Sequence, residues 1–553
     1  MRVFNCFYLH TRRGTSVSLT FKRPFMKATF RKSMIWLHTY LGVILGWLLF
    51  AIFFTGTLSY FTPEITRYLM PERGSISQSQ QSMIAHSFSY LNKHAGEAEE
   101  WRIALPLERS ALWSVQWREG KQRQTVTFNN QLAARENETE TKGGLFFRNF
   151  HYTLQLRGYG GRYIAGIAAM AMLLAIFTGI YTHRRFFKDF FTLRPQKIKK
   201  WTTDFHALAG ILTIPFCIMI CLSGIFIYAI MYLPYTANAN FERGERGVNR
   251  QIIPSLPSLR LDEKVIGSDN LLSEPPSTST PVPNYAHILE KIANQWREPN
   301  SIARITVEGV GYKNSRMIVE RSKATTVSNR ADRLVFETYT GKSLEGYDDE
   351  TVPAQIRRIL YGLHQANFAP FGMRWLLFGL GILGCALIAT GNIIWVTQRK
   401  KSAKQNPFTL ALVEKGNVAA VAGLILASVS FFIANKVIGQ DVAGRAQLEV
   451  NTFFTVWALS AVHAFLRTKA AVAWKEQFAL ASGLCFVTVA IELVLFRDRI
   501  VRSVEYLDSV YLSFIPAFFA SGIILYWAAK KIGLRITNAE IVAKNTKPST
   551  YEK

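Results

Sequence analysis

Two stretches of this sequence follow one pattern: LHTYLGVILGWLLFAIFFTGTL (residues 37–58) and FHALAGILTIPFCIMICLSGIF (residues 205–226). Each begins beside a histidine, His38 or His206, and has a glycine four residues later. Each then reaches a Ser/Thr-Gly pair whose glycine stands 18 residues after the histidine. The residues between are mostly apolar, and about 20 such residues span the hydrocarbon core of a bilayer as a helix. The two stretches therefore predict a membrane protein with an internal duplication.

A second pair of segments follows the same order. NFHYTLQL contains His151 and precedes an apolar run that reaches a Thr-Gly pair at 178–179. GLHQANF contains His364 and precedes a run that reaches a Thr-Gly pair at 390–391. The repeating unit is thus a helix, a long polar loop and a helix. Two such units in parallel are usually related by an axis along the membrane normal.

The 553 residues are 49% hydrophobic, and the apolar residues gather into about eight runs. Helices suit these runs because lipid offers no partner to a free backbone amide. Membrane helices are expected in the duplicated part at 35–61, 162–183, 206–233 and 373–397, and in a C-terminal four-helix extension (417–529) at 417–435, 450–466, 477–496 and 509–529. No cleavable signal peptide is expected, and a start at Met26 instead of Met1 would remove most of the basic leader.

The formal net charge of +27 gives the expected orientation. Basic residues gather in the leader (1–34), in the turn at 184–205, after the fourth span and towards the tail (530–553). By the positive-inside rule these segments, and so both termini, are cytoplasmic in a bacterial inner membrane. Nucleic-acid binding is excluded, because no soluble module interleaves basic and aromatic residues.

Two long polar loops, 62–160 and 234–372, are then periplasmic. The first contains the strand-like segments SALWSVQW and QTVTF. The second contains a helical YAHILEKIANQW, followed by ARITVEG, RMIVER and RLVFETYTGKSL. Their alternation of apolar and polar residues predicts a helix with a small antiparallel sheet. The segment PPSTSTPVP (275–283) reads as a flexible connector.

Five histidines lie at the ends of the four duplicated spans: His38, His206 and His183 at the cytoplasmic face, and His151 and His364 at the periplasmic face. Haem iron takes axial imidazoles, which helical bundles supply from facing helices. A haem near each face would carry electrons across roughly 30 Å of hydrocarbon. A single interfacial histidine is more often an amphipathic anchor, and Ser/Thr-Gly pairs are common in helix packing. The recurrence at equivalent positions nevertheless favours a four-helix bundle with two b-type haems, the outer one held by His151 and His364.

For the inner haem the sequence leaves three histidines for two positions. The duplication favours His38 with His206. His183 has no counterpart, because Trp395 stands at its place in the second unit. We therefore rank His38 first, His206 second and His183 third. The basic turn offers possible partners for haem propionates: Arg184, Arg185 and Lys188.

These features resemble PepSY-associated transmembrane proteins. The resemblance rests on the His-x-x-x-Gly spans, the NFH and LH segments, the turn THRRFFKDFFTLRP (182–195) with the following DFHALAG (204–210), and the strand VFETYTG (335–341). It covers about residues 30–400, and longer members carry a C-terminal extension. It implies PepSY-like folds for both loops. Characterised relatives are haem-containing inner-membrane reductases of ferric siderophores, so the resemblance also implies a periplasmic ferric chelate as acceptor.

The expected function is that of an oxidoreductase that passes electrons from the inner to the outer haem and on to chelated Fe(III). The sequence has no flavin or nicotinamide motif, so the electron donor is a separate cytoplasmic or membrane component. One alternative is a non-redox PepSY protein whose loops bind peptides or restrain a protease. Another is a small-solute transporter, which should show discontinuous helices and charges at mid-membrane. Glu492 lies in a span but about one turn from Arg497, so an interfacial position is expected for it.

Overall fold

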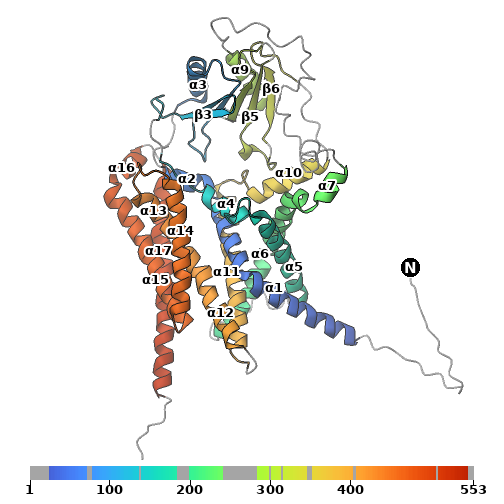
Figure 1. The fold of residues 1–553 in the computed structure, drawn as a ribbon, viewed down its shortest axis with the longest axis vertical. Coiled ribbons are helices and arrows are strands. Elements are labelled where there is room, and N and C mark those ends of the chain that lie inside the picture. The colour runs from blue at the N-terminus through green and yellow to red at the C-terminus, as the bar shows by residue number, and fades with distance from the viewer. Residues whose placement is uncertain are drawn as a thin grey trace, which may run out of the picture.

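A computed structural model describes residues 24–70, 78–135, 139–183, 198–240, 283–297, 301–312, 315–329, 331–344, 352–402, 406–505 and 508–545. It consists of a layer of long helices and, on one side of that layer, a domain built on a β-sheet (Figure 1). We call the side of the helical layer nearest the sheet the sheet side, and the opposite side the far side.

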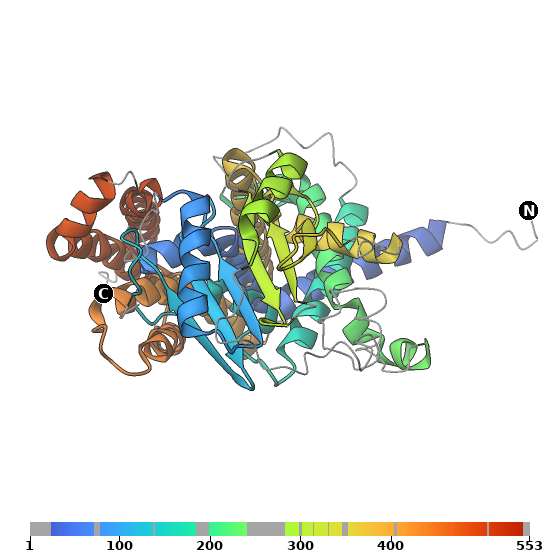
Figure 2. The ribbon, with the colours of Figure 1, turned by 90° about the horizontal axis from the view of Figure 1, so that it is seen from above.

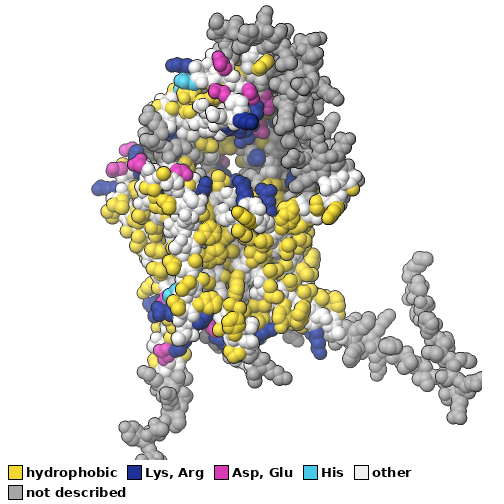
Figure 3. Space-filling view, in the orientation of Figure 1, with side chains coloured by type: hydrophobic (Ala, Val, Ile, Leu, Met, Phe, Trp, Pro, Cys, Tyr) yellow, Lys and Arg dark blue, Asp and Glu magenta, His cyan; other side chains and the backbone are white. Residues whose placement is uncertain are grey.

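Within the described residues, seven helices are long and apolar enough to cross a membrane. Hydrophobic side chains cover the outside of this layer in a broad belt, and basic side chains lie near both of its edges (Figure 3). The chain is therefore a multi-pass membrane protein. The seven are α1 (Pro24–Ser59), α5 (Gly161–Thr182), α6 (Ile198–Tyr232), α11 (Phe371–Arg399), the continuous α12 (Pro407–Val418), η3 (Ala419–Gly423) and α13 (Leu424–Val437), α15 (Ala470–Leu495) and α17 (Ser509–Asn545).

The expected span at 450–466 lies within α14 (Arg445–Leu466), which is not one of the seven. Polar residues such as Glu449 reduce its hydropathy. Its packing nevertheless follows the whole length of the helix before it. Asn435 of α13 donates to Glu449 at one end (2.8 Å), and Lys415 of α12 donates to the carbonyl of Phe465 at the other (2.8 Å). α14 thus runs antiparallel to α12–α13 and crosses the same layer.

The fifth span begins at Pro407, ten residues before its expected start. The side chain of Asn406 accepts hydrogen bonds from the backbone N–H groups of Phe408 and Thr409, and proline occupies the first helical position. Asparagine at the N-cap followed by proline is a strong helix-start signal. Residues 407–416 are therefore helical, although the charged Glu414 and Lys415 interrupt their apolar run in the sequence.

The four duplicated helices form a ring in the order α1, α5, α6, α11, in which each helix contacts the next and α11 closes the ring on α1. α1 and α6, the first helices of the two units, therefore lie diagonally opposite each other, as do α5 and α11. This is the arrangement expected for two parallel repeats related by an axis along the membrane normal.

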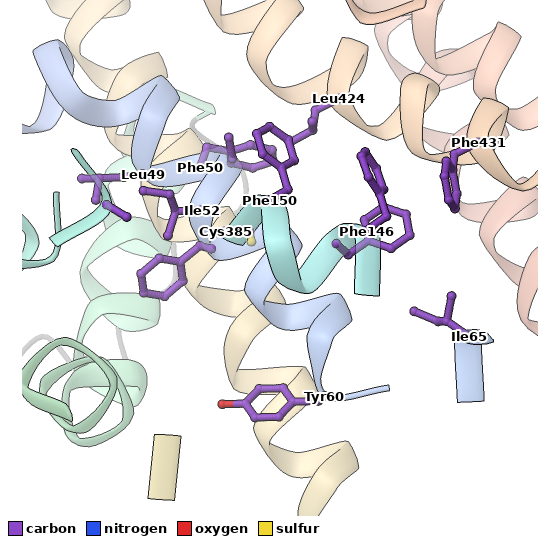
Figure 4. Packing of buried hydrophobic residues seen from close by; sticks show 14 of the residues in the cluster. Leu49, Phe50, Ile52, Tyr60, Ile65, Phe146, Phe150, Cys385, Leu424 and Phe431 are labelled. Atoms are coloured by element: carbon purple, nitrogen blue, oxygen red, sulfur yellow. The ribbon is translucent and has the colours of Figure 1, made fainter. Parts of the chain in front are cut away.

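The C-terminal helices pack against this ring directly, at α1 and α11, and also through a short helix, α4 (Leu145–Thr153). Phe146 of α4 stacks on Phe431 with ring centroids 4.7 Å apart and meets Phe453 edge-on at 4.8 Å. One continuous hydrophobic core runs from Leu49 of α1 through Phe146 to the C-terminal helices (Figure 4). α4 is therefore fixed between the two groups of helices.

The sheet unites strands from both loops in one antiparallel array of order β3-β2-β1-β4-β5-β6. β1 and β4 pair at its centre, with Arg102 opposite Thr306. Each loop was expected to form its own α+β fold, but the structure joins them, because each half covers the open edge of the other. The strands are β1 (Glu100–Ala104), β2 (Ser114–Glu119) and β3 (Gln122–Thr127) from the first loop, and β4 (Ile302–Glu308), β5 (Arg316–Arg321) and β6 (Arg333–Glu337) from the second.

Two helices, α3 (Gln80–His94) and α9 (Tyr285–Trp296), cover one face of this sheet, away from the membrane helices (Figures 1 and 2). Phe88 of α3 stacks on Tyr285 of α9 (5.0 Å), and both helices share a core with Trp101 and Val307 of the central strands. The other sheet face is polar and is directed towards the helical layer. The shorter helices are α2 (Thr62–Leu69), α7 (Pro234–Asn240), η2 (Lys323–Thr325), α10 (Val352–Gln365) and α16 (Arg497–Glu505).

Candidate cofactor site: two pairs of histidines

Four of the five singled-out histidines form two pairs, one at each end of the four-helix ring. On the far side, His38 of α1 and His206 of α6 have ring centroids 6.4 Å apart. On the sheet side, His151 of α4 and His364 of α10 have ring centroids 5.8 Å apart. The structure therefore brings together the histidines that the duplication makes equivalent.

Each of these imidazoles is oriented by a hydrogen bond at Nδ1. Nδ1 donates to a backbone carbonyl of a neighbouring helix, and among the described residues these rings make no hydrogen bond through Nε2. That bond fixes the tautomer and leaves the Nε2 lone pair free for a metal. The Nδ1–oxygen distances are 2.9 Å from His38 to Ala175, 3.0 Å from His206 to Leu387 and 2.8 Å from His151 to Ile52; His364 lies beside the Ile220 carbonyl and 2.8 Å from Ser223 Oγ.

Each Ser/Thr-Gly pair supports one of these four imidazole rings, and we call the pair the seat of that histidine. In every case the accepting carbonyl lies four residues before the glycine of such a pair, and the imidazole lies against that glycine. A Cβ on Gly56 would stand 2.6 Å from His151 Nδ1, and one on Gly179 would stand 3.1 Å from His38 Cε1. Gly391 and Gly224 take the same places beside His206 and His364, at 3.1 and 3.5 Å. The pairs thus serve a more specific purpose than general helix packing.

The hydroxyl of each pair is used within its own helix. Thr178 Oγ1 donates to the Leu174 carbonyl (2.9 Å), and Thr390 Oγ1 donates to the Ala386 carbonyl (2.7 Å). A small polar residue followed by glycine therefore leaves a shallow surface, with its hydroxyl already hydrogen-bonded, against which a flat ring fits. The seats are exchanged within each unit: α1 seats the histidine that precedes α5, and α5 seats the histidine of α1.

The spacing of each pair suits one metal ion between two imidazoles. Two metal–nitrogen bonds of about 2 Å, with about 1 Å from each nitrogen to its ring centre, give a centroid separation of about 6 Å. No cluster of three or more His, Cys, Asp or Glu side chains that would hold a metal occurs among the described residues. Haem needs only two protein ligands, because the macrocycle supplies the other four nitrogens.

The sheet-side pair, His151 and His364, is held in the neutral form that can ligate a metal. Burial lowers the pKa of His151. Burial, and secondly the charge that His151 would carry, lower the pKa of His364 to about 3. Two cationic imidazoles at this distance would repel each other without solvent to screen them, whereas metal ligation requires the neutral ring.

Buried donors without acceptors lie close to both pairs. Trp395, one turn after Gly391, has a buried indole N–H with no hydrogen-bond partner among the described residues, and the guanidinium of Arg399 lies 4.1 Å above its ring. Arg357 precedes His364 by two turns of α10, and its buried Nε likewise has no partner in the part of the chain that the structure describes. Such groups fit the carboxylates of a bound cofactor. The residues present therefore fit haem in donor type, spacing, cradle and charge.

His183 is the C-cap residue of α5, where its backbone N–H donates to the carbonyl of Gly179 (3.1 Å). It lies one turn after Gly179, on the same helix face as the seat of His38. For this reason the sequence alone left both His183 and His206 as candidates for the second ligand of the inner haem. The predicted propionate partners Arg184, Arg185 and Lys188 lie outside the described residues. Sequence reasoning missed Trp395 as a donor, although its position as the counterpart of His183 was a signal.

The comparison with known proteins gives a match over the part of the chain that contains the two histidine pairs. No curated protein matches the chain significantly. The model of one family, described as the PepSY-associated TM region, matches residues 35–398. That range is more than half of the chain; it contains both repeat units and both histidine pairs, and it ends before α12. The chain therefore belongs to the PepSY-associated transmembrane family.

Proposed function

We propose that this protein is an inner-membrane oxidoreductase that moves electrons from the far side, in the cytoplasm, to the sheet side, in the periplasm, and there reduces a ferric chelate such as a ferric siderophore. The observation that carries the proposal is the set of two histidine pairs with free Nε2 atoms. An apolar helical anchor would need neither the pairs nor their seats, because a buried polar ring is costly unless it is used.

His38 and His206 would hold one b-type haem, and His151 and His364 the other. The bound haem supplies one-electron chemistry, and the protein supplies position and electrostatics. The carbonyls of the seats orient the rings and raise the basicity of the ligating nitrogen, which favours the ferric state of a bound iron. Arg399 and Arg357 would meet the propionates at the two ends.

The region between the sheet and α4 supports an anionic acceptor. Lys323 lies within electrostatic reach of Arg304 on the polar face of β4 and of Arg148 on α4, three residues before His151. The side chain of Lys323 is exposed, and Glu320 lies 3.2 Å from Arg304, so Lys323 and Arg148 carry the accessible positive charge of this region. Hard, anionic oxygen ligands hold Fe(III) more tightly than Fe(II), so reduction at such a cationic site would loosen the chelate.

The test is the haem content of the purified protein. We expect reduced b-type bands and two haems per chain. His151→Ala and His364→Ala should each remove the outer haem and keep the inner one. His94→Ala is the control, because His94 is exposed and bonds only to the Tyr90 carbonyl of its own helix among the described residues. Full haem content in both variants would refute the assignment of the outer site.

The inner site is tested by His38→Ala, His206→Ala and His183→Ala. The first two should lose the inner-haem signal in low-temperature spectra of the reduced protein, and the third should keep it. Retention in His206→Ala with loss in His183→Ala would reverse the pairing. A colourless, fully helical wild-type protein would instead favour the alternative, a membrane anchor whose outer domain binds peptides.

A further inference from the structure

A large apolar cavity of about 790 Å³ lies between α11 of the four-helix ring and the C-terminal helices α15 and α17. Its walls are mostly aliphatic and aromatic, and its volume is that of a site for a small organic molecule. The lining residues that matter here are Ala389, Thr390, Trp474 and Phe478 in the body of the cavity, and Lys469 and Glu540 among its charged residues.

The cavity borders the inner histidine pair. Thr390 lines it, and Thr390 Oγ1 lies 3.3 Å from Nδ1 of His206. A molecule in the cavity would thus be separated from this imidazole by a single side chain. The family match ends at residue 398, so the second wall of the cavity comes from the extension that follows the matched region.

The polarity of the cavity changes along its length. Lys469, Arg535 and Glu540 are exposed, and Lys469 Nζ lies 3.1 Å from Glu540 Oε1. Trp474 and Phe478, with ring centroids 5.2 Å apart, offer flat apolar surfaces on which a ring can stack. This lining suits a molecule with a flat head that accepts hydrogen bonds and a long apolar tail.

We propose that this cavity binds a membrane quinol, which is the electron donor of the protein. The inference rests on the proposed function and names its missing donor. A phospholipid also has apolar chains, but its phosphate would meet the carboxylate of Glu540, which already neutralises one of the two cations. A quinol has no charge, and its hydroxyl protons need an acceptor such as this carboxylate.

The reaction balances without a further component. One quinol loses two hydrogens and becomes a quinone, with the release of two protons and two electrons. Glu540 accepts a proton at the exposed end and passes it to water on the far side, and water takes the second proton. The two electrons leave one at a time by way of His206 and reduce two ferric ions of the acceptor to ferrous ions.

The test follows haem reduction after mixing the purified protein with decylubiquinol. Wild-type protein should be reduced by decylubiquinol and, separately, by dithionite. Ala389→Phe adds a phenyl ring to the cavity wall beside Thr390 and should slow reduction by the quinol by about tenfold or more, the effect of about 1.4 kcal/mol of lost binding. Its haem content and its reduction by dithionite should not change. Ala479→Phe is the matched control, because Ala479 is an exposed residue of α15 that does not line the cavity.

A second variant and a binding measurement make the outcomes decisive. Glu540→Gln should slow quinol oxidation and change its pH profile, while decylubiquinone binding, measured by calorimetry, stays as in the wild type. Reduction by dithionite but not by quinol overturns the donor and leaves the proposed function intact. A protein without haem overturns the proposed function, and calorimetry still tests the cavity. A co-purified phospholipid that decylubiquinone fails to displace assigns the cavity to lipid and refutes the proposal.

Discussion

Glycine within a long helix is unfavourable relative to alanine by roughly 0.5–1 kcal/mol, so its presence calls for a compensating contact. At Gly56 that contact is the ring of His151, which approaches the backbone more closely than any side chain would permit. Gly42, on the same helix, has open space where its Cβ would stand. These two of the three glycines of α1 therefore have different reasons to be there, and substitution separates them.

We predict that Gly56→Ala weakens the outer haem site. The new methyl group would displace the ring of His151 and break its bond to the Ile52 carbonyl, and changes of this kind lower metal affinity by about 10- to 100-fold. The measurement is the ratio of haem to protein together with the reduced spectrum. Gly42→Ala should keep wild-type values in both. An unchanged outer-haem signal in Gly56→Ala would show that the seat is not required.

The internal duplication decided which residues of the site could be predicted from the sequence. The equivalent positions of His38 and His206 were visible because both copies keep the same residue type. The seats were visible only as spacing, since periodicity does not show which helix faces which. Arg357 and Trp395 were not predicted, because a buried donor without an acceptor is recognised only after its surroundings are known.

Among the elements, the C-terminal helices α13 and α15 are joined by a buried ion pair that also contacts α2. Lys436 of α13 lies 2.7 Å from Glu492 of α15, and both side chains are 1% exposed. Tyr511 of α17 donates to Glu492, and Lys436 Nζ lies 4.1 Å above the ring of Tyr68 in α2. Glu492 was expected at the membrane interface and lies near the end of α15; its partner Lys436 is 56 residues away in the sequence, beyond the reach of local pattern.

We predict that Glu492→Leu is strongly destabilising, because it removes the carboxylate that lies 2.7 Å from the buried ammonium of Lys436. Loss of one partner of a buried pair costs about 3–5 kcal/mol, whereas replacing both by apolar residues is often neutral. Thermal unfolding in detergent should therefore show a large loss for Glu492→Leu and recovery for Lys436→Met combined with Glu492→Leu. If the double variant is no more stable than the single one, the pair is not the source of the loss.

The exposed pair between Lys400 and Glu414 gives the comparison for this experiment. Ion pairs at the surface contribute about 0–1 kcal/mol. Glu414→Gln should consequently leave the unfolding temperature close to that of the wild-type protein.

At the scale of the whole molecule, the sheet ties the two repeat units together outside the helical layer. The hydrogen bond from the Leu105 N–H to the Ala303 carbonyl (3.0 Å) places Arg102 and Thr306 at a position without direct hydrogen bonds, where facing side chains are closest. Arg102→Cys with Thr306→Cys should therefore form a disulfide under mild oxidation, detected by mass spectrometry of the linked peptides. Arg102→Cys with Glu320→Cys, two strands apart, should not. Equal yields would contradict the central pairing.

The orientation in the membrane remains a prediction from charge. In a Cys6→Ser background, Gly120→Cys in the β2–β3 turn should react with an impermeant maleimide in intact cells. Ser402→Cys, just after α11, should react only after the membrane is permeabilised. The cysteines at 217, 221, 385 and 485 are buried and should stay unlabelled. Reaction of both new cysteines in intact cells would refute the topology.

The strands themselves were predictable from alternating residues, but their partners were not. Alternation assigns one face of a strand to the core, as for Trp101 and Ile103, and carries no information about the neighbouring strand. The same limit applies to α14: its span was expected at 450–466, but the helix against which it packs was not. In both cases the missing information lies in contacts between segments far apart in the chain.

The pairing of β1 with β4 has a consequence for how the protein is made. About 200 residues, including two membrane helices, separate these strands, and at about 5–20 residues per second β4 emerges roughly 10–40 s after β1. During that interval the edge of β1 is open and its apolar face lacks half of its cover. The first loop must therefore wait as an unfinished domain exposed to proteases and to other nascent chains. A chain arrested before residue 300 should be degraded much faster than the complete protein.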